Sequence, residues 1–123
     1  MPSTTPVLKK MSPQLQVASI ENSIDFYTKK LGFRLEFRFE DFYAGLVKDG
    51  HSIHIKSGST QRNEDKNMED LEITFSVDCI ERLYTEVLGN SIVIIQPLRD
   101  MPYGREFYIA DPDLNIIAFM EEP

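Results

Sequence analysis

A short internal repeat is the feature of this sequence that most constrains its fold. Residues 17–21 read Val-Ala-Ser-Ile-Glu and residues 77–81 read Val-Asp-Cys-Ile-Glu, an offset of 60 positions. In each copy, an alternating stretch that is typical of a strand gives way to apolar residues at helical spacing. Each of these expected helices ends at a Leu-Gly pair, at residues 31–32 and 88–89. The repeat therefore predicts two copies of one structural unit.

The first half of the chain has the pattern of a strand, a helix and three further strands. Leu15 and Val17 alternate with glutamines, which predicts a half-buried strand. Ser19 is the expected N-cap of a helix whose apolar stripe is Ile20, Ile24, Tyr27 and Leu31, and Gly32 is its expected end. The remaining strands are predicted at residues 33–39, 42–47 and 51–56, the last two joined by an Asp-Gly turn.

The same order returns after a polar stretch. Residues 71–77 alternate as a strand, and Asp78, with Glu81 three residues later, predicts a capped helix with an apolar stripe. Strands follow at residues 91–96, 105–110 and 116–121. We therefore expect an α+β fold in one domain, built from two tandem βαβββ modules: module one at about residues 12–58, a linker at 59–70 and module two at 71–123.

The composition is that of an ordinary globular protein. The chain has 123 residues, of which 41% are hydrophobic and 27% charged, and this excludes wholesale disorder. The longest apolar run, Ile116–Met120, is too short to cross a membrane, and no apolar stretch of a secretory signal follows Lys9 and Lys10. A lone cysteine, Cys79, excludes an internal disulfide and favours a reducing compartment. We therefore expect a cytoplasmic protein.

The charge balance excludes two classes of partner. Thirteen basic residues stand against twenty acidic ones, for a net charge of −7. This is the wrong sign for nucleic acid or an anionic membrane surface. A negative field attracts cationic partners, and the alternative explanation of the charge is solubility alone.

Three segments of the chain carry a family resemblance. Residues 17–27, 31–33 and 104–115 together resemble the vicinal oxygen chelate superfamily, which includes glyoxalase I, extradiol dioxygenases and bleomycin-resistance proteins. The last segment, Gly-Arg-Glu-Phe followed by an Asp-Pro-Asp turn, most resembles the bleomycin-resistance-like branch. One departure is Leu114, where the family usually has glycine. The resemblance implies mixed, strongly curved sheets that form a concave cleft, with the helices on the other side of the sheets, facing outward.

The resemblance also places four metal-ligand positions at Ser12, His54, Glu72 and Ala118. Ala118 has no donor atom, and the neutral hydroxyl of Ser12 is a poor ligand. Because a divalent metal needs several converging donors, His54 and Glu72 are only residual metal candidates. We therefore expect no cofactor, and His54 is interpreted as a pocket histidine paired with Glu72.

Strand alternation predicts the residues of a ligand pocket. The polar members alternate with residues expected beneath the helices, and aromatic side chains from neighbouring strands close the cleft around them. The predicted ligand-binding residues are Gln14, Gln16, Phe39, Tyr43, His54, Glu72, Thr74 and Tyr103. In this interpretation Glu72 anchors a cationic group and His54 holds Glu72 by a hydrogen bond.

Two functions are compatible with the resemblance. The first is a non-catalytic binding protein of the bleomycin-resistance type, in which a dimer forms clefts that sequester a flat or cationic small molecule. The alternative is a metal-dependent glyoxalase-type lyase or dioxygenase that uses His54 and Glu72. The sequence presents no set of nucleophile and base, so no catalytic residue is assigned, and the incomplete metal set favours the binding protein.

We predict that the protein is a homodimer. A single βαβββ module exposes strand edges, and in related proteins two modules pair at these edges. The arm at residues 1–12 is the candidate for a segment exchanged with the partner, as in bleomycin-resistance relatives. Light scattering at micromolar concentration should give twice the chain mass of 14.2 kDa. A value equal to one chain would contradict the prediction.

Overall fold

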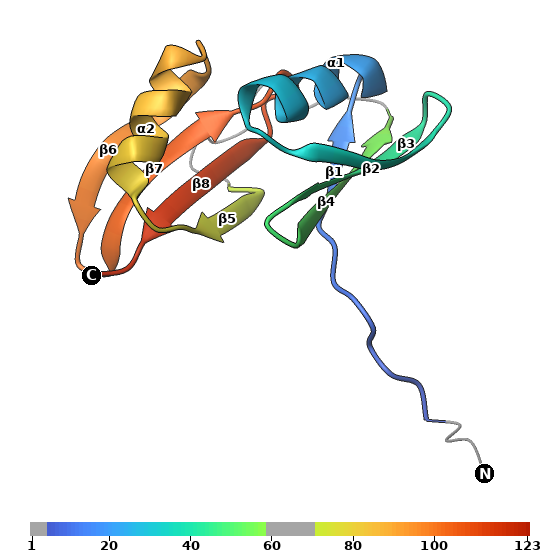
Figure 1. Ribbon diagram of the computed structural model, residues 1–123, viewed down its shortest axis with the longest axis horizontal. Coiled ribbons are helices and arrows are strands. Elements are labelled where there is room, and N and C mark those ends of the chain that lie inside the picture. Colours follow the sequence, from blue (N-terminus) through green and yellow to red (C-terminus); the bar gives the residue numbers. More distant parts are fainter. Residues whose placement is uncertain (1–4, 59–70) are drawn as a thin grey trace.

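The computed structural model describes residues 5–58 and 71–123, which form two modules of the same design. The predicted linker at 59–70 lies outside the described residues. The first module contains β1 (Gln14–Val17), α1 (Ile20–Asp25), η1 (Phe26–Lys30), β2 (Arg34–Phe39), β3 (Tyr43–Lys48) and β4 (His51–Ser57). The second contains β5 (Ile73–Ser76), α2 (Ile80–Gly89), β6 (Val93–Met101), β7 (Gly104–Ala110) and β8 (Ile116–Glu121). Figure 1 shows the modules side by side. The predicted α+β fold with two βαβββ modules is confirmed.

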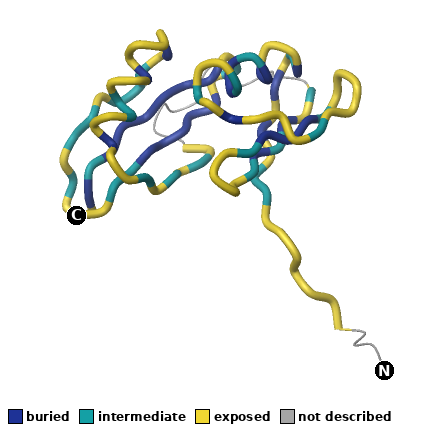
Figure 2. The backbone as a smooth tube through the Cα atoms, viewed as in Figure 1, coloured by how far each residue is buried: buried dark blue, intermediate teal, exposed yellow. Residues whose placement is uncertain are grey.

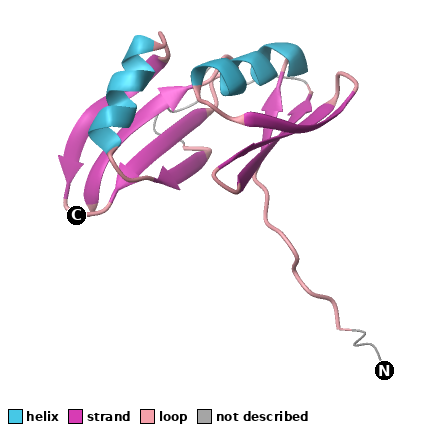
Figure 3. Cartoon of the chain, viewed as in Figure 1, coloured by secondary structure: helices cyan, strands magenta, loops and turns pink. Residues whose placement is uncertain are grey.

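Each module has a mixed sheet of four strands, in the orders β1-β4-β3-β2 and β5-β8-β7-β6. The first strand of each module runs parallel to the last, and the other neighbours are antiparallel (Figure 3). The repeat recognised in the sequence lies at equivalent places, where β1 leads into α1 and β5 leads into α2. The strong curvature of the sheets and the concave cleft stay predictions.

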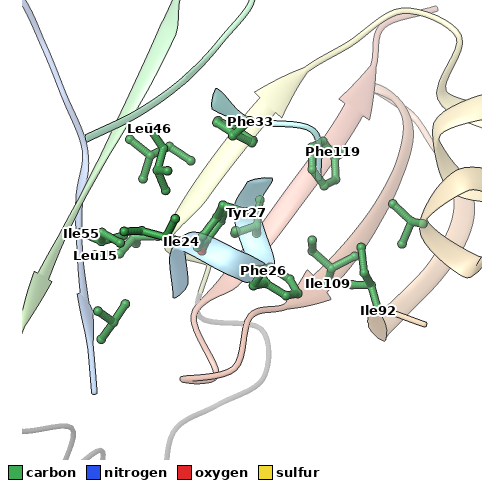
Figure 4. Packing of buried hydrophobic residues seen from close by; sticks show 14 of the residues in the cluster. Leu15, Ile24, Phe26, Tyr27, Phe33, Leu46, Ile55, Ile92, Ile109 and Phe119 are labelled. Atoms are coloured by element: carbon green, nitrogen blue, oxygen red, sulfur yellow. The ribbon is translucent and has the colours of Figure 1, made fainter. Parts of the chain in front are cut away.

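The helix of the first module packs between the two sheets. Figure 4 shows α1 and η1 with Leu15 and Ile55 of the first sheet on one side and Ile109 and Phe119 of the second on the other. These side chains belong to one buried cluster that joins both modules. Each sheet therefore turns one face to the shared core and its other face, here called the outer face, away from it.

The predicted helix widens at its centre. The residues expected to form a single α-helix from Ile20 to Leu31 become a π-helix, η1, from Phe26 onward. The sequence placed Tyr27 in the apolar stripe and missed Phe26, yet both are buried. A helix that lies between two sheets can bury two consecutive aromatic residues, one toward each sheet. The wider π turn accommodates both of these buried side chains.

One of the two predicted helix caps is wrong. Ser19 caps α1 as expected, because its Oγ accepts a hydrogen bond from the N–H of Asn22 at 3.1 Å. In the second module the N-cap is Cys79 rather than Asp78, and no side chain of α2 itself forms a cap hydrogen bond. The carboxylate of Glu121 at the end of β8 accepts instead from the N–H groups of Cys79 and Ile80. A cap supplied by a distant strand leaves no local signal in the sequence.

The buried carboxylate of Asp111 joins the two modules. Its Oδ1 accepts from the N–H groups of Asp113 and Asn115, and its Oδ2 accepts from the Asn115 amide, all within the turn before β8. Oδ2 also accepts from the hydroxyl of Tyr27 in η1 at 2.8 Å. Burial, and then the nearby Asp111 charge and its hydrogen bond, raise the pKa of Tyr27 well above its usual value, so the phenol stays a donor.

The same turn holds the end of β1. Asp113 Oδ1 accepts from the N–H of Ala18 at 2.9 Å, and Asn115 Nδ2 donates to the carbonyl of Gln16 at 3.2 Å. Leu114 lies between these two residues with a left-handed φ of 62°. The turn therefore keeps the backbone shape that glycine favours, although its residue is leucine.

The segment before β1 extends away from the modules (Figures 1 and 2). Residues 6–13 have no helix or strand, and Val7, Leu8 and Met11 are exposed. Lys10 reaches back to Glu36 in β2, with Nζ 3.6 Å from the carboxylate. Among the residues that the structure describes, no helix is long and apolar enough to cross a membrane.

Replacing Tyr27 with Phe should destabilise the protein by about 1.5–3 kcal/mol, because it removes a buried hydrogen bond to a charged group. Tyr84→Phe is the matched control, since the Tyr84 hydroxyl forms no hydrogen bond within the described residues and its loss should cost less than about 0.5 kcal/mol. Urea denaturation of both variants measures the difference. Equal free energies of unfolding would show that the Tyr27–Asp111 contact does not stabilise the module interface.

Replacing Leu114 with Gly should stabilise the protein by about 1 kcal/mol relative to Leu114→Ala, because a left-handed φ is strained for any residue with a Cβ. The Ala variant is the control, since it removes the leucine side chain and keeps the Cβ. Urea denaturation again provides the comparison. A glycine variant no more stable than the alanine variant would contradict a strained turn.

Candidate ligand-binding site

Aromatic side chains gather on the outer face of the first sheet. Gly45 is paired with Phe37 on one side and His54 on the other, and Phe39 is paired with Tyr43. Residues paired across a sheet share a face, so these side chains lie opposite the buried core residues. The sequence predicted one unbroken alternation over 33–39. A bulge between Leu35 and Phe37 instead moves Phe37 and Phe39 to the face opposite Leu35.

Phe37, Phe39, Tyr43 and His54 form what we call the ring cluster. The Phe37 ring stacks on Tyr43 at 5.8 Å and meets the edge of His54 at 5.2 Å. Phe39 packs 5.7 Å from Phe37 and remains 57% exposed. A Cβ at Gly45 would lie only 2.2 Å from the Phe37 ring, so glycine is what lets that ring lie on the sheet. The cluster is an apolar surface partly open to solvent.

A hydrogen-bond chain leads from Gln14 through Tyr43 to His54. Gln14 donates to the Tyr43 hydroxyl at 3.1 Å, and that hydroxyl lies 2.8 Å from His54 Nδ1. With the Tyr43 hydroxyl assigned as the hydrogen-bond donor to Nδ1, neutral His54 carries its proton on Nε2. Nε2 is buried and has no hydrogen-bond partner within the described residues. Burial, and then the charge of Lys10, lower the pKa of His54, while Glu36 opposes them. The ring is therefore a neutral donor.

A charged cluster occupies the outer face of the second sheet. Glu106 of β7 is 4% exposed and is paired across the sheet with Arg99 of β6. The guanidinium donates to Glu106 Oε2 from two nitrogens, at 2.8 and 2.6 Å. Tyr103 donates to Oε1 at 2.6 Å, and Tyr108 to Oε2 at 2.9 Å. We call these four residues the Glu106 cluster.

The Glu106 cluster holds its carboxylate ionised. Burial acts to raise the pKa of Glu106, but hydrogen bonds from Tyr103, Arg99 and Tyr108 outweigh it, and the pKa is lowered. The same contact raises the pKa of Tyr103 to about 12. The charged groups are therefore mutually satisfied, and the Tyr103 ring and part of the Arg99 side chain face solvent.

The donors on the outer faces do not make a metal site. Ala118, one of the four implied ligand positions, is paired with Thr74 and Tyr108 in an apolar patch and has no donor atom. Within residues 5–58 and 71–123, no three His, Cys, Asp or Glu side chains are grouped closely enough to hold an ion. The residues present do not fit a catalytic metal at the family's position, and we derive no metal-dependent step.

The structure brings some of the predicted ligand-binding residues together. Gln14, Phe39, Tyr43 and His54 are joined on the first sheet, and the exposed Gln16 side chain lies over Gly58 on the same sheet. Thr74 and Tyr103 lie on or beside the second sheet, and Glu72 precedes β5, its N–H donating to Ile116. His54 takes Tyr43 as its partner in place of Glu72.

Sequence reasoning missed four residues of the two clusters: Phe37, Arg99, Glu106 and Tyr108. Phe37 belongs to the strand predicted at 33–39, but the bulge that sets its face has no local signature. The alternation of Glu106 with Phe107 did place a carboxylate opposite a core residue in β7. That alternation was the available signal for a buried charge requiring a partner.

The chain resembles proteins of known sequence and structure. A family model, the Glyoxalase/Bleomycin resistance protein/Dioxygenase superfamily, matches residues 10–119. Bleomycin resistance proteins of Geobacillus stearothermophilus and Staphylococcus aureus are 29% identical over 127 residues, which cover 89% of this chain and 94% of theirs.

Solved structures share the fold. A glyoxalase/bleomycin resistance protein/dioxygenase from Alicyclobacillus acidocaldarius superimposes with a TM-score of 0.78 at 18% identity, covering 99% of this chain and 95% of that one. TioX from Micromonospora sp. ML1 gives 0.76 at 18% identity, covering 94% and 99%.

The hydrogen-bond chain predicts that neutral His54 is protonated on Nε2 and titrates below the usual histidine pKa of 6.5. Long-range ¹H–¹⁵N spectra recorded across a pH series measure both the tautomer and the pKa of His54. Tyr43→Phe is the control, because it removes the hydroxyl and should return a mixture of tautomers. Since unfolded His54 binds a proton more readily, stability should fall as the pH drops through 6.5. A proton on Nδ1 in the native protein would contradict the assignment.

Proposed function

The chain belongs to the Glyoxalase/Bleomycin resistance protein/Dioxygenase superfamily, and from this membership we propose that it is a small-molecule-binding protein resembling bleomycin-resistance proteins. In this proposal it sequesters a flat or cationic ligand on its outer faces without a catalytic metal. The predicted ligand-binding residues, together with Phe37, line the site. The protein acts in the cytoplasm as a single domain.

The ring cluster carries the proposal. The exposed Phe39 ring and the partly exposed rings of Phe37 and Tyr43 offer flat surface for stacking, and the Nε2–H of His54 is a donor without a partner among the described residues. An unpaired buried donor is costly, so a ligand acceptor that displaces the atoms covering Nε2 gains a hydrogen bond that the free protein does not form. Apolar walls with a few polar groups are typical of small-molecule sites.

Pairing of two copies would complete the cleft. Both clusters lie on sheet faces directed away from the shared core of one chain. We propose that a homodimer sets the ring cluster of one copy against the Glu106 cluster of the other. The carboxylate of Glu72 then supplies negative charge for a cationic group, in keeping with the net charge of −7.

We expect bleomycin to bind more weakly to Phe39→Ala, by about fivefold, because stacking on an exposed ring contributes on the order of 1 kcal/mol. Phe42→Ala is the matched control: Phe42 is similarly exposed at the neighbouring turn and makes no ring contact within the described residues. Glu72→Gln should also weaken binding while leaving stability nearly unchanged. Isothermal titration calorimetry measures all three.

Two results would contradict the proposal. One is equal affinity of the Phe39→Ala and Phe42→Ala variants for bleomycin. The other is a stoichiometric divalent metal on protein purified without chelator, which would favour the lyase or dioxygenase alternative with His54 and Glu72 as ligands.

A further inference from the structure

A cavity lies between the modules, on the helix side of both sheets. Its volume is about 710 Å³, within the range of drug-sized ligand sites. One wall comes from the end of η1 and the turn between β3 and β4, and the other from β5, the start of α2 and the end of β8. The lining includes no residue of the ring cluster or the Glu106 cluster, so this pocket is distinct from the site proposed above.

The floor of this inter-module pocket is aromatic. Phe33, Phe75 and Phe119 line it, with Leu31 and Val77 beside them. The rings of Phe75 and Phe119 stack at 5.8 Å, and Phe33 lies 6.2 Å from Phe75. Phe33 and Phe119 are buried, whereas Phe75 keeps part of its surface exposed. A ligand with an apolar body would cover that remaining surface.

The rim of the pocket is acidic. Four carboxylates line it, from Asp49, Asp78, Glu121 and Glu122, against one lysine, Lys48. Glu121 is committed to the N-terminus of α2. The carboxylates of Asp78 and Glu122 are exposed and form no ion pair within the described part of the chain. The aromatic floor and the excess of carboxylates together favour a ligand that is apolar in its body and positively charged.

We infer that the inter-module pocket binds an organic cation with an aromatic or branched apolar body. The body packs on Phe33, Phe75 and Phe119, and the ammonium or guanidinium group meets the carboxylates of Asp78 and Glu122. An aromatic ring close to a cation adds a further attraction. This inference does not rest on the function proposed for the outer faces, and either can fail without the other.

Three probes of one shape test the inference by ¹H–¹⁵N NMR titration: 4-phenylbutylamine, which is cationic at neutral pH, neutral 4-phenylbutan-1-ol and anionic 4-phenylbutanoate. The amine should shift the backbone amides of Phe75, Asp78 and Glu122 and leave those of Gly45 and Glu106 in place. It should bind at least about fivefold more tightly than the alcohol at low salt, with the difference shrinking as salt screens the rim.

Charge variants make the test specific. Asp78→Asn combined with Glu122→Gln should reduce the preference for the amine over the alcohol to within about twofold. Glu40→Gln combined with Glu86→Gln removes the same charge from exposed positions outside the pocket and should retain the preference. Asp49→Asn tests the opposite wall if the first pair does not fold, since asparagine tolerates the left-handed φ of 51° there.

The inference is overturned if the amine produces no shifts at millimolar concentration, or shifts amides of the outer faces in place of the pocket. It is equally overturned if the amine binds no more tightly than the alcohol, or if the pocket variants and the control pair show the same preference.

Discussion

The buried carboxylate of Asp111 is the interaction on which the arrangement of the two modules depends. It organises its own turn through three hydrogen bonds and accepts a fourth from Tyr27 of the other module. A buried charge is tolerated only when it is paired or fully hydrogen-bonded, so these donors must all be present at once. That requirement ties the turn before β8 to η1 and keeps this helix between the sheets. The outer faces are directed away from the core as a consequence.

The two outer faces differ in how completely their polar groups are satisfied. In the Glu106 cluster every oxygen of the carboxylate has a donor, and removing Arg99 would leave the nearly buried Glu106 charge without its counter-ion. In the ring cluster, His54 Nε2 has no partner within residues 5–58 and 71–123, and Phe39 is half exposed. The Glu106 cluster therefore sets the shape and charge of its face. The ring cluster keeps a hydrogen-bond donor and apolar surface that a ligand can use.

Much of the fold could be predicted from the sequence because its signals are local. Alternation at β1, the cap at Ser19 and the stop at Gly32 depend on residues a few positions apart. The features that could not be predicted depend on distant contacts. Phe26 is buried only because a second sheet packs against η1, and the cap on α2 comes from Glu121 across the module.

The site shows the same division between local and distant signals. His54 lies on the sheet face opposite Ile53 and Ile55, as strand alternation requires. The pairing between His54 and Tyr43 was not predicted, since Nδ1 takes whichever donor the neighbouring strand presents. The bulge in β2 and the Arg99–Glu106 pair depend on cross-strand register, which one strand's own sequence does not specify.

A crystal structure of the protein with bleomycin would test the central claim most directly, because it locates the ligand rather than measuring an affinity. The account predicts ligand density stacked on Phe39 and Tyr43, with an acceptor atom within hydrogen-bond distance of His54 Nε2 and a second copy of the chain closing the cleft. Bleomycin bound away from the outer faces, or a metal ion coordinated by His54 and Glu72, would contradict it.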